Sequence, residues 1–263
     1  MMKIIISPAK QMKTDQDWMK PEQLPALLED TRILYRILRS MNRTELKKLF
    51  GASDKITEEN YVRYQAMNLE QGLTTALLAY QGLAFSGMAP QVFTDRQWAY
   101  ARKHLKILSG FYGILNTGDG VAPYRLEMQA RLHTERGSNL YEFWGDRIYR
   151  TLAEELKQEA GEGEEKIILN LASKEYSRVI EPWARTEPGI QFVTCVFGEW
   201  TGEKVKVKGT LAKMARGRMC AWLAAEEIQD TGRIREFREL GFSFEEALST
   251  PEELVFLRRA ENH

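Results

Sequence analysis

The sequence predicts a mixed α/β fold: one globular domain, residues 1–263, with a largely parallel or mixed sheet flanked by helices. Two observations lead to this fold class. Short, continuous apolar runs recur along the chain, and each ends in a small polar residue. Amphipathic helical patterns lie between these runs. Strands buried on both faces and alternating with helices are typical of parallel or mixed sheets.

The expected elements follow from these patterns in order. Helices are expected at 27–38 and 147–156, where apolar residues recur at three- or four-residue spacing. The acidic segment EAGEGEE, residues 159–165, is expected to be an exposed loop that leads from a helix into a strand. The expected strands are the apolar runs at 4–7, 83–87, 107–110 and 167–170.

The C-terminal part predicts a hairpin followed by a helix. Residues 192–197 are mostly apolar and predict the first strand. After a Thr-Gly turn at 201–202, residues 203–208 contain charged side chains, mostly lysine, that alternate with valine. This alternation is typical of a strand with one apolar face. Residues 210–227 then carry an apolar stripe at helical spacing.

The ends of the expected strands carry Ser7, Ser86, Ser109 and Asn170. Ligands of open α/β sheets bind beyond the carboxyl ends of parallel strands, so these side chains predict a shared polar cleft. The alternative is that each residue only ends its strand or caps the next helix. The residues expected to line the cleft are Ser7, Lys10, Ser109, Tyr124, Arg125, Glu127, Asn170, Ser173 and Tyr176.

Composition limits the function classes. Lys plus Arg and Asp plus Glu both total 37, so the chain is not generally basic, although a local basic patch remains compatible with this balance. The two cysteines show no CxxC spacing and the three histidines no metal-ligand spacing, so neither a metal nor another cofactor is expected. The N-terminal apolar run is too short for a signal peptide, and no run approaches a membrane span. We therefore expect a soluble cytoplasmic protein without a membrane partner.

The glycine-rich stretch LSGFYGILNTGDGVAPYRLEM, residues 108–128, does not match a nucleotide-binding loop. Its glycines fit neither GxGxxG nor GxxxxGK[ST], and the GDG triplet predicts only a turn. In an extended segment, Arg125 and Glu127 point the same way. They are either a structural ion pair or an arginine held by a carboxylate to receive an anionic oxygen. Lys10, Arg125 and Glu127 are the candidate catalytic residues, and whether the protein is an enzyme stays open.

Residues 204–218 contain six basic residues and no acidic one. Lys213 and Arg216 are three positions apart, so they share a helix face. The cluster is either a solvated charged surface or a site for nucleic-acid or nucleotide phosphates. The phosphate-binding candidates here are Lys204, Lys206, Lys208, Lys213 and Arg216.

Residues 46–55, LKKLFGASDK, approximate the hxxhxGhG pattern of a helix-hairpin-helix. The backbone amides of such a hairpin grip a DNA phosphate without reading bases. The element would span about 41–68, with Ser53 in place of the second glycine. An ordinary joint between two packed helices is the alternative. The candidate DNA-binding residues of this element are Lys47, Lys48, Gly51, Ser53, Lys55 and Arg63.

Several longer motifs occur along the chain in one order: ISPAK, SDK, LSGFYG, PYRLEM, LYEFWGD, NLASKEY and AKMARGRM. In these motifs and their order the chain resembles the YaaA family of bacterial peroxide stress response proteins. The resemblance covers nearly the whole sequence.

The resemblance implies a cytoplasmic protein that lowers free intracellular iron during hydrogen peroxide stress. It further implies binding of duplex and branched DNA through a helix-hairpin-helix, here 46–55, and a positively charged cleft. By position, the cleft would include Lys10, Arg125, Lys213 and Arg216. The serine at position 53 and the segment 116–120 depart from the family pattern.

Three functional hypotheses follow. The first is a protein that binds double-stranded or branched DNA without sequence specificity, in peroxide defence. The second is an enzyme or sensor for a nucleotide-like, phosphorylated small ligand, in which Lys10, Arg125, Lys213 and Arg216 bind phosphate. In that hypothesis Glu127 orients Arg125 or acts as a base, and Ser7, Asn170 and Tyr176 position the ligand. The third is an interaction protein whose motifs are only core architecture.

Overall fold

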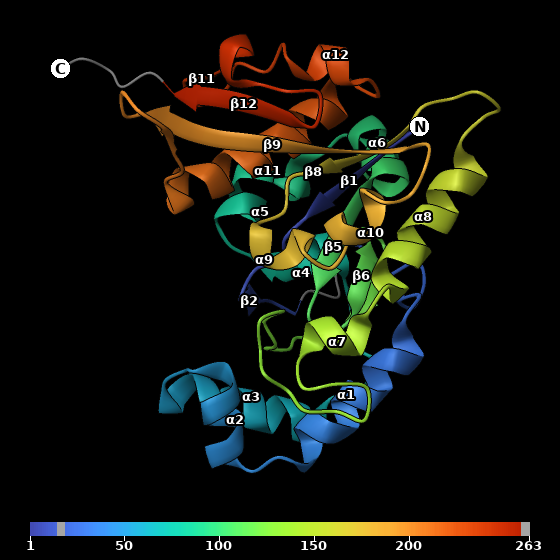
Figure 1. Ribbon diagram of the computed structural model, residues 1–263. Coiled ribbons are helices and arrows are strands. Elements are labelled where there is room, and N and C mark those ends of the chain that lie inside the picture. The colour runs from blue at the N-terminus through green and yellow to red at the C-terminus, as the bar shows by residue number, and fades with distance from the viewer. Residues whose placement is uncertain (15–18, 259–263) are drawn as a thin grey trace.

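A computed structural model describes residues 1–14 and 19–258. Its centre is an eight-stranded sheet in which seven strands follow the order β11-β12-β9-β8-β1-β5-β6 and β10 pairs with β9 (Figure 1). Strands β5, β1, β8, β9 and β12 are parallel to one another, whereas β6, β10 and β11 are antiparallel to β5, β9 and β12, respectively. The strands of this sheet are β1 Met2–Ile6, β5 Leu105–Ser109, β6 Gly113–Asn116, β8 Lys166–Asn170, β9 Ile190–Trp200, β10 Val205–Lys206, β11 Phe242–Phe244 and β12 Glu253–Arg258.

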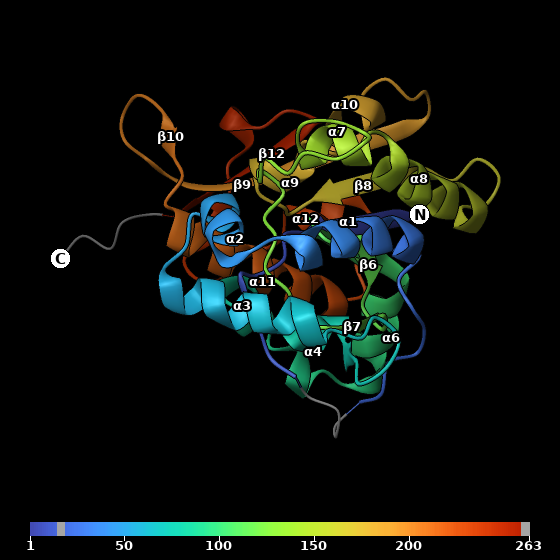
Figure 2. The same ribbon diagram turned by 90° about the horizontal axis from the view of Figure 1, so that it is seen from below.

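Helices cover both faces of this sheet. Helices α5, α6 and α11 pack together on one side, and α8 and α10 lie on the other (Figures 1 and 2). The helices are α1 Leu28–Ser40, α2 Arg43–Phe50, α3 Asp54–Ala66, α4 Ala76–Ala79, α5 Leu83–Met88, α6 Asp95–His104, α7 Leu140–Trp144, α8 Arg147–Glu159, α9 Lys174–Ser177, α10 Glu181–Ala184, α11 Gly209–Ala225 and α12 Thr231–Ile234. Two short paired sheets join β2 Gln11–Met12 to β4 Tyr80–Gln81 and β3 Thr74–Thr75 to β7 Gly120–Val121.

The predicted mixed α/β class is confirmed, as are most of the predicted elements. Helix α8 ends at Glu159, and residues 160–165 connect it to β8. Strands β9 and β10 form the predicted hairpin, in which Val205 pairs with Trp200. The strand predicted at 83–87 is wrong, because these residues form helix α5 and Ser86 lies inside it. The alternating segment 203–208 contributes only Val205–Lys206 to the sheet.

Helix α5 forms where it does because it packs closely against α11. A Cβ added at Gly217 of α11 would lie 1.8 Å from the backbone oxygen of Ala84, and one at Gly87 would lie 2.8 Å from the backbone oxygen of Met214. The two backbones therefore touch at both glycines. A short apolar run does not distinguish a buried strand from a buried helix, and here tertiary packing decides.

The buried side chain of Asp119 stabilises the turn at residues 117–118, where the GDG triplet begins. The Asp119 carboxylate accepts hydrogen bonds at 2.8 Å from both the Gln23 side-chain amide and the Asn116 backbone N–H. Burial nevertheless raises the pKa of Asp119 to about 6, because the hydrogen bonds only partly offset the loss of hydration. Only the first glycine of the triplet lies in the turn, because Asp119 forms a bridge with Gln23 and Gly120 begins β7.

We expect Asp119→Asn to flatten the dependence of stability on pH. The folded protein holds the Asp119 proton more tightly than the unfolded chain, so this carboxyl favours folding at low pH. Its contribution is lost as pH rises from about 4 to about 6, by about 2–3 kcal/mol. Asparagine keeps only one of the two acceptor oxygens, so the variant should be less stable than the wild type near pH 4. Between pH 4 and pH 8 its free energy of unfolding, relative to the wild type, should rise by about 2 kcal/mol. Urea unfolding across this range measures the difference, with the exposed Asp95→Asn as control. If the difference in unfolding free energy between this variant and the wild type did not change with pH, the raised pKa of Asp119 would be contradicted.

Candidate functional site

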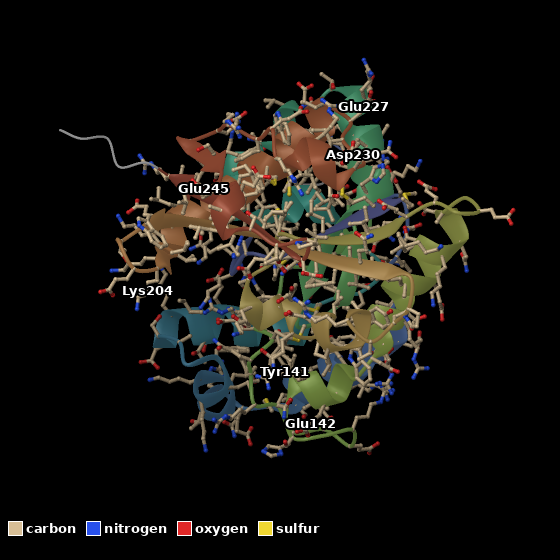
Figure 3. All side chains as sticks on the ribbon, turned by 45° about the horizontal axis from the view of Figure 1, so that its top comes forward. Tyr141, Glu142, Lys204, Glu227, Asp230 and Glu245 are labelled. Carbon is tan, nitrogen blue, oxygen red and sulfur yellow. The ribbon has the colours of Figure 1, made fainter. Side chains whose placement is uncertain are left out.

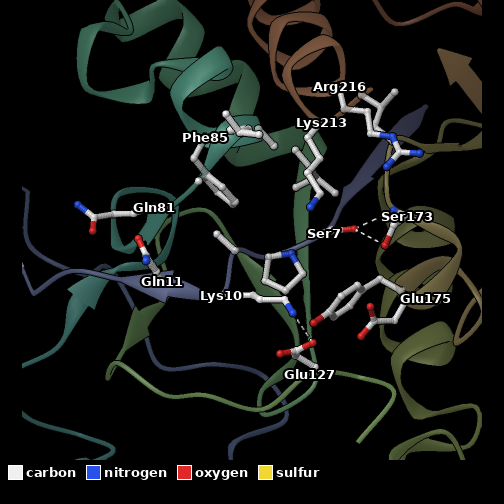
Figure 4. Close-up of a pocket in the computed structure, with 18 of the residues that line it drawn as sticks. Ser7, Lys10, Gln11, Gln81, Phe85, Glu127, Ser173, Glu175, Lys213 and Arg216 are labelled. Atoms are coloured by element: carbon white, nitrogen blue, oxygen red, sulfur yellow. Dashed lines mark hydrogen bonds and ion pairs between the residues drawn. The ribbon is translucent and has the colours of Figure 1, made fainter. Parts of the chain in front are cut away.

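A cavity of about 340 Å³ lies beyond the carboxyl ends of the adjacent parallel strands β1 and β8 (Figure 4). This is the position at which ligands of open α/β sheets bind. Its walls come from the segments that follow these two strands, from the segment 124–127, and from helices α5 and α11. Polar and charged lining residues are Ser7, Lys10, Gln11, Gln81, Tyr124, Arg125, Glu127, Ser173, Glu175, Tyr176, Lys213 and Arg216.

The segments after β1 and β8 are joined through two serines. The Ser173 backbone N–H donates to the Ser7 hydroxyl at 2.8 Å, and the two hydroxyl groups lie 3.2 Å apart. Ser173 is also the residue before helix α9. This pairing fixes the floor of the cavity across two neighbouring strands.

Arg125, Glu127 and Lys10 form one charged network. Glu127 Oε1 accepts from Arg125 Nη2 at 2.8 Å, and Glu127 Oε2 lies 2.8 Å from Lys10 Nζ. Arg125 and Glu127 are both largely buried, whereas Lys10 is mostly exposed. The Nε atom of Arg125 is buried and has no hydrogen-bond partner. Two cations share one carboxylate here, so the network keeps a net positive charge.

The glycine-rich stretch positions this network. A Cβ at Gly110 would lie 2.6 Å from the Leu126 backbone oxygen, so only glycine allows the segment 125–127 to approach β5 this closely. Tyr64 of α3 fixes the same segment from the other side, since its hydroxyl donates to the Arg125 backbone oxygen at 2.9 Å. Residues 108–113 therefore support the segment 125–127 without lining the cavity themselves.

Lys213 and Arg216 enter the cavity from α11, opposite Lys10 and Glu127 (Figure 4). Within residues 1–14 and 19–258, neither side chain has an ion-pair partner. The Arg216 Nε atom is buried and has no hydrogen-bond partner. Burial lowers the pKa of Arg216, a sign that its charge is poorly compensated.

Glu175 is a further residue of the cavity that was not predicted from the sequence. This carboxylate lines the cavity, and its Oε1 accepts a hydrogen bond at 3.3 Å from the Gln129 backbone N–H. Burial, assisted by the nearby charge of Glu127, raises the pKa of Glu175. Its place in the NLASKEY motif, two residues after Ser173, was the available signal.

Two residues expected to line the cleft do not do so. Ser109 is fully buried behind Tyr124, whose hydroxyl lies 2.6 Å from its Oγ, and Ser109 also accepts the backbone N–H of Tyr112. Asn170 is buried and hydrogen-bonded to Ala172 N and Thr194 Oγ1. Both residues shape the ends of their strands, which was the structural alternative for such positions.

Tyr124 and Tyr176 do line the cavity, as almost fully buried side chains. Burial raises the pKa of Tyr124 to about 12 and that of Tyr176 well above its usual value. Both phenols are therefore neutral at physiological pH and act there only as hydrogen-bonding groups.

The α2–α3 unit lies outside this cavity. The two helices are joined through Gly51, in the left-handed conformation with φ 54°, and Ser53. Lys47 pairs with Asp54 at 2.6 Å and Arg63 with Glu59 at 2.5 Å, while Lys48 and Lys55 are exposed. A groove of about 760 Å³ runs between α2 and the segment 127–133, and Glu127 lines both this groove and the cavity.

The hairpin lysines also lie outside the cavity. Lys204 and Lys206 are exposed, Lys204 being at the periphery of the molecule in Figure 3, and Lys208 pairs with Glu199 at 2.6 Å. The basic cluster of the sequence therefore divides into two groups, of which only Lys213 and Arg216 face the cavity.

Within residues 1–14 and 19–258, no group of three or more His, Cys, Asp or Glu side chains is placed to hold a metal ion. In the same part of the chain, no helix has the length and apolar character needed to cross a bilayer.

The whole chain has clear relatives. Residues 2–248 match the family described as peroxide stress protein YaaA. A UPF0246 protein of Desulfitobacterium hafniense is 48% identical over 257 residues, which cover 98% of each chain. A UPF0246 protein of Agathobacter rectalis is 43% identical over 258 residues, 98% of this chain and 99% of the relative. The chain therefore belongs to the YaaA family of peroxide stress proteins.

Proposed function

We propose that this peroxide stress protein binds a small phosphorylated ligand of nucleotide size in the cavity beyond β1 and β8, as an enzyme or a sensor. The observation that carries the proposal is Arg216, a guanidinium whose Nε is buried without a partner and whose side chain has no counter-ion in the described chain. A buried charge is costly unless an opposite charge and hydrogen bonds compensate it.

A phosphate group satisfies these requirements. A guanidinium presents a planar array of donors that matches phosphate oxygens, and Lys213 adds a second cation on the same wall of the cavity. The Ser7 hydroxyl lies at the end of β1 within the same cavity. A volume of about 340 Å³ is near the lower limit for small-molecule sites, roughly 300–1,000 Å³, and suits one nucleotide better than a dinucleotide.

Glu127 lies across the cavity from Lys213 and Arg216, and its role in such a site is to hold two further cations. Bound to Lys10 and Arg125, it fixes both cations in one orientation before a ligand arrives. Preorganised charges bind an anion with a smaller loss of side-chain freedom.

Thermal unfolding with added ligands tests this proposal. A ligand at 100 times its Kd stabilises the folded state by about 2.7 kcal/mol, which raises the Tm by several degrees. We expect such a rise with at least one common nucleoside phosphate, and a smaller rise in Lys213→Ala. The control is Lys55→Ala on α3, which should respond like the wild type. Equal stabilisation of Lys213→Ala and the wild type would place the ligand elsewhere.

A second candidate function is DNA binding without sequence specificity, through which the protein would limit oxidative DNA damage and, indirectly, free iron. The supporting observation is the groove beside α2, which is lined by Lys48, Gly51 and Arg131 and shares the lining residue Glu127 with the cavity. Lys55, Lys204 and Lys206 add exposed positive charge that has no ion-pair partner among the residues described.

Salt dependence tests the DNA candidate. Each neutralised phosphate contributes about −0.9 to the slope of log Kobs against log salt for duplex DNA. The double variant Lys48→Ala, Lys55→Ala should therefore lower the magnitude of the slope by nearly two in a fluorescence anisotropy titration. The control is Lys157→Ala on α8, where the lysine pairs with Glu187 at 2.5 Å. An affinity for duplex DNA that is insensitive to salt would remove this candidate.

A further inference from the structure

The charges of the cavity are divided between two ends. Lys213, Arg216 and the serine pair Ser7–Ser173 lie at one end (Figure 4). The Glu127 carboxylate, which is paired with Lys10 and Arg125, and the Glu175 carboxylate lie at the other end. A ligand that carried only an anionic group would leave the second end unused. The arrangement instead suits a molecule with an anionic group at one end and hydrogen-bond donors at the other.

The two carboxylates have different surroundings. Both oxygens of Glu127 are engaged by Arg125 and Lys10, so its acceptor sites are largely occupied. Glu175 has no ion-pair partner in the described chain and accepts a long hydrogen bond, at 3.3 Å, from the Gln129 backbone. It therefore keeps acceptor capacity for a ligand, as a carboxylate offers about four lone-pair positions.

Part of the cavity wall is apolar. Leu83, Ala84 and Phe85 of α5 and Leu171 after β8 line the cavity. An apolar wall combined with a few polar groups is typical of sites for small molecules whose ring faces are less polar than their substituents. Sugar rings with vicinal hydroxyl groups fit this description, and a carboxylate that accepts from ribose hydroxyls is the usual selector for them.

We propose that the ligand contains a ribose phosphate, whose phosphate group binds at Arg216 and Lys213 and whose vicinal hydroxyls donate to Glu175. This inference rests on the proposed function, because it assigns the ligand class to the same cavity. Glu175 is on this view a specificity-determining residue that selects ribose over deoxyribose.

Isothermal titration tests the inference with defined probes. These are inorganic phosphate, ribose 5-phosphate, the four common ribonucleoside 5′-monophosphates and their 2′,3′-dideoxy counterparts. A hydrogen bond to a charged acceptor contributes about 10- to 100-fold in affinity, so the dideoxy form of the best nucleotide should bind weaker by at least that factor. In Glu175→Gln the ribo and dideoxy forms should bind within about threefold of each other.

The matched control is Glu181→Gln on α10, where the glutamate pairs with Arg185 at 2.9 Å. It should keep the wild-type discrimination. Equal binding of ribo and dideoxy forms by the wild type overturns the inference and leaves the proposed function standing, as does a discrimination that persists in Glu175→Gln. Failure of every phosphorylated probe to bind, inorganic phosphate included, overturns both.

Discussion

Replacing Arg216 by methionine is expected to weaken binding of the proposed phosphorylated ligand strongly and to make the unliganded protein more stable. Arg216 lies in a largely buried position without a counter-ion, and burial already lowers its pKa. Methionine is apolar and of similar length, so it fills the space without a charge to desolvate, which should stabilise the fold by about 1 kcal/mol or more. Losing a buried charged contact to a phosphate costs about 2–5 kcal/mol, so Kd should rise by about 30-fold or more.

Urea unfolding and titration calorimetry on the same variant measure both effects. Arg218→Met is the control, because Arg218 lies on the same helix, bonds to Glu239 Oε2 from its Nε at 2.8 Å, and lies outside the cavity. It should lose stability or stay unchanged and should bind ligand normally. An Arg216→Met protein that is less stable than the wild type, with unchanged affinity, would mean that Arg216 has a structural role.

The largest loss of stability is expected from Gly217→Ala. Its methyl group would stand 1.8 Å from the Ala84 backbone oxygen and 2.7 Å from its carbonyl carbon. Both contacts are with backbone, so no side chain is able to turn away and α5 must separate from α11. We expect a loss of more than about 3 kcal/mol, above the usual range for overpacking. This corresponds to a Tm lower by roughly 10 °C.

Gly209→Ala provides the comparison for this variant. Gly209 begins the same helix, and a Cβ there has nothing within 4 Å. Because alanine favours helix over glycine, its Tm in a circular dichroism melt should be unchanged or slightly higher. If the two variants melted at the same temperature, the close contact between α5 and α11 would not be a source of stability.

The sequence predicts the sheet well because its strands are continuous apolar runs, a pattern set by burial on both faces. Residues 4–6, 107–109 and 167–170 are strands as expected. The run at 83–87 fails because its partner is not a strand but α11, more than a hundred residues away in the sequence. Local pattern does not carry that information.

The candidate site was predictable in part for a related reason. Parallel strands end at one edge, so residues that follow them meet, and Ser7, Lys10 and Ser173 line one cavity. Sequence position does not tell whether a strand-end side chain faces the cavity or the interior, which is why Ser109 and Asn170 point elsewhere. The functional roles of these residues stay predictions.

Glu127 lines both the cavity and the groove beside α2, so a ligand in one of them affects the other. An occupant of the cavity that draws Arg125 or Lys10 toward itself weakens their hold on this carboxylate and leaves more negative potential in the groove. Occupancy of the two hollows is then thermodynamically linked. By reciprocity, an anion in the groove would weaken binding in the cavity by the same factor.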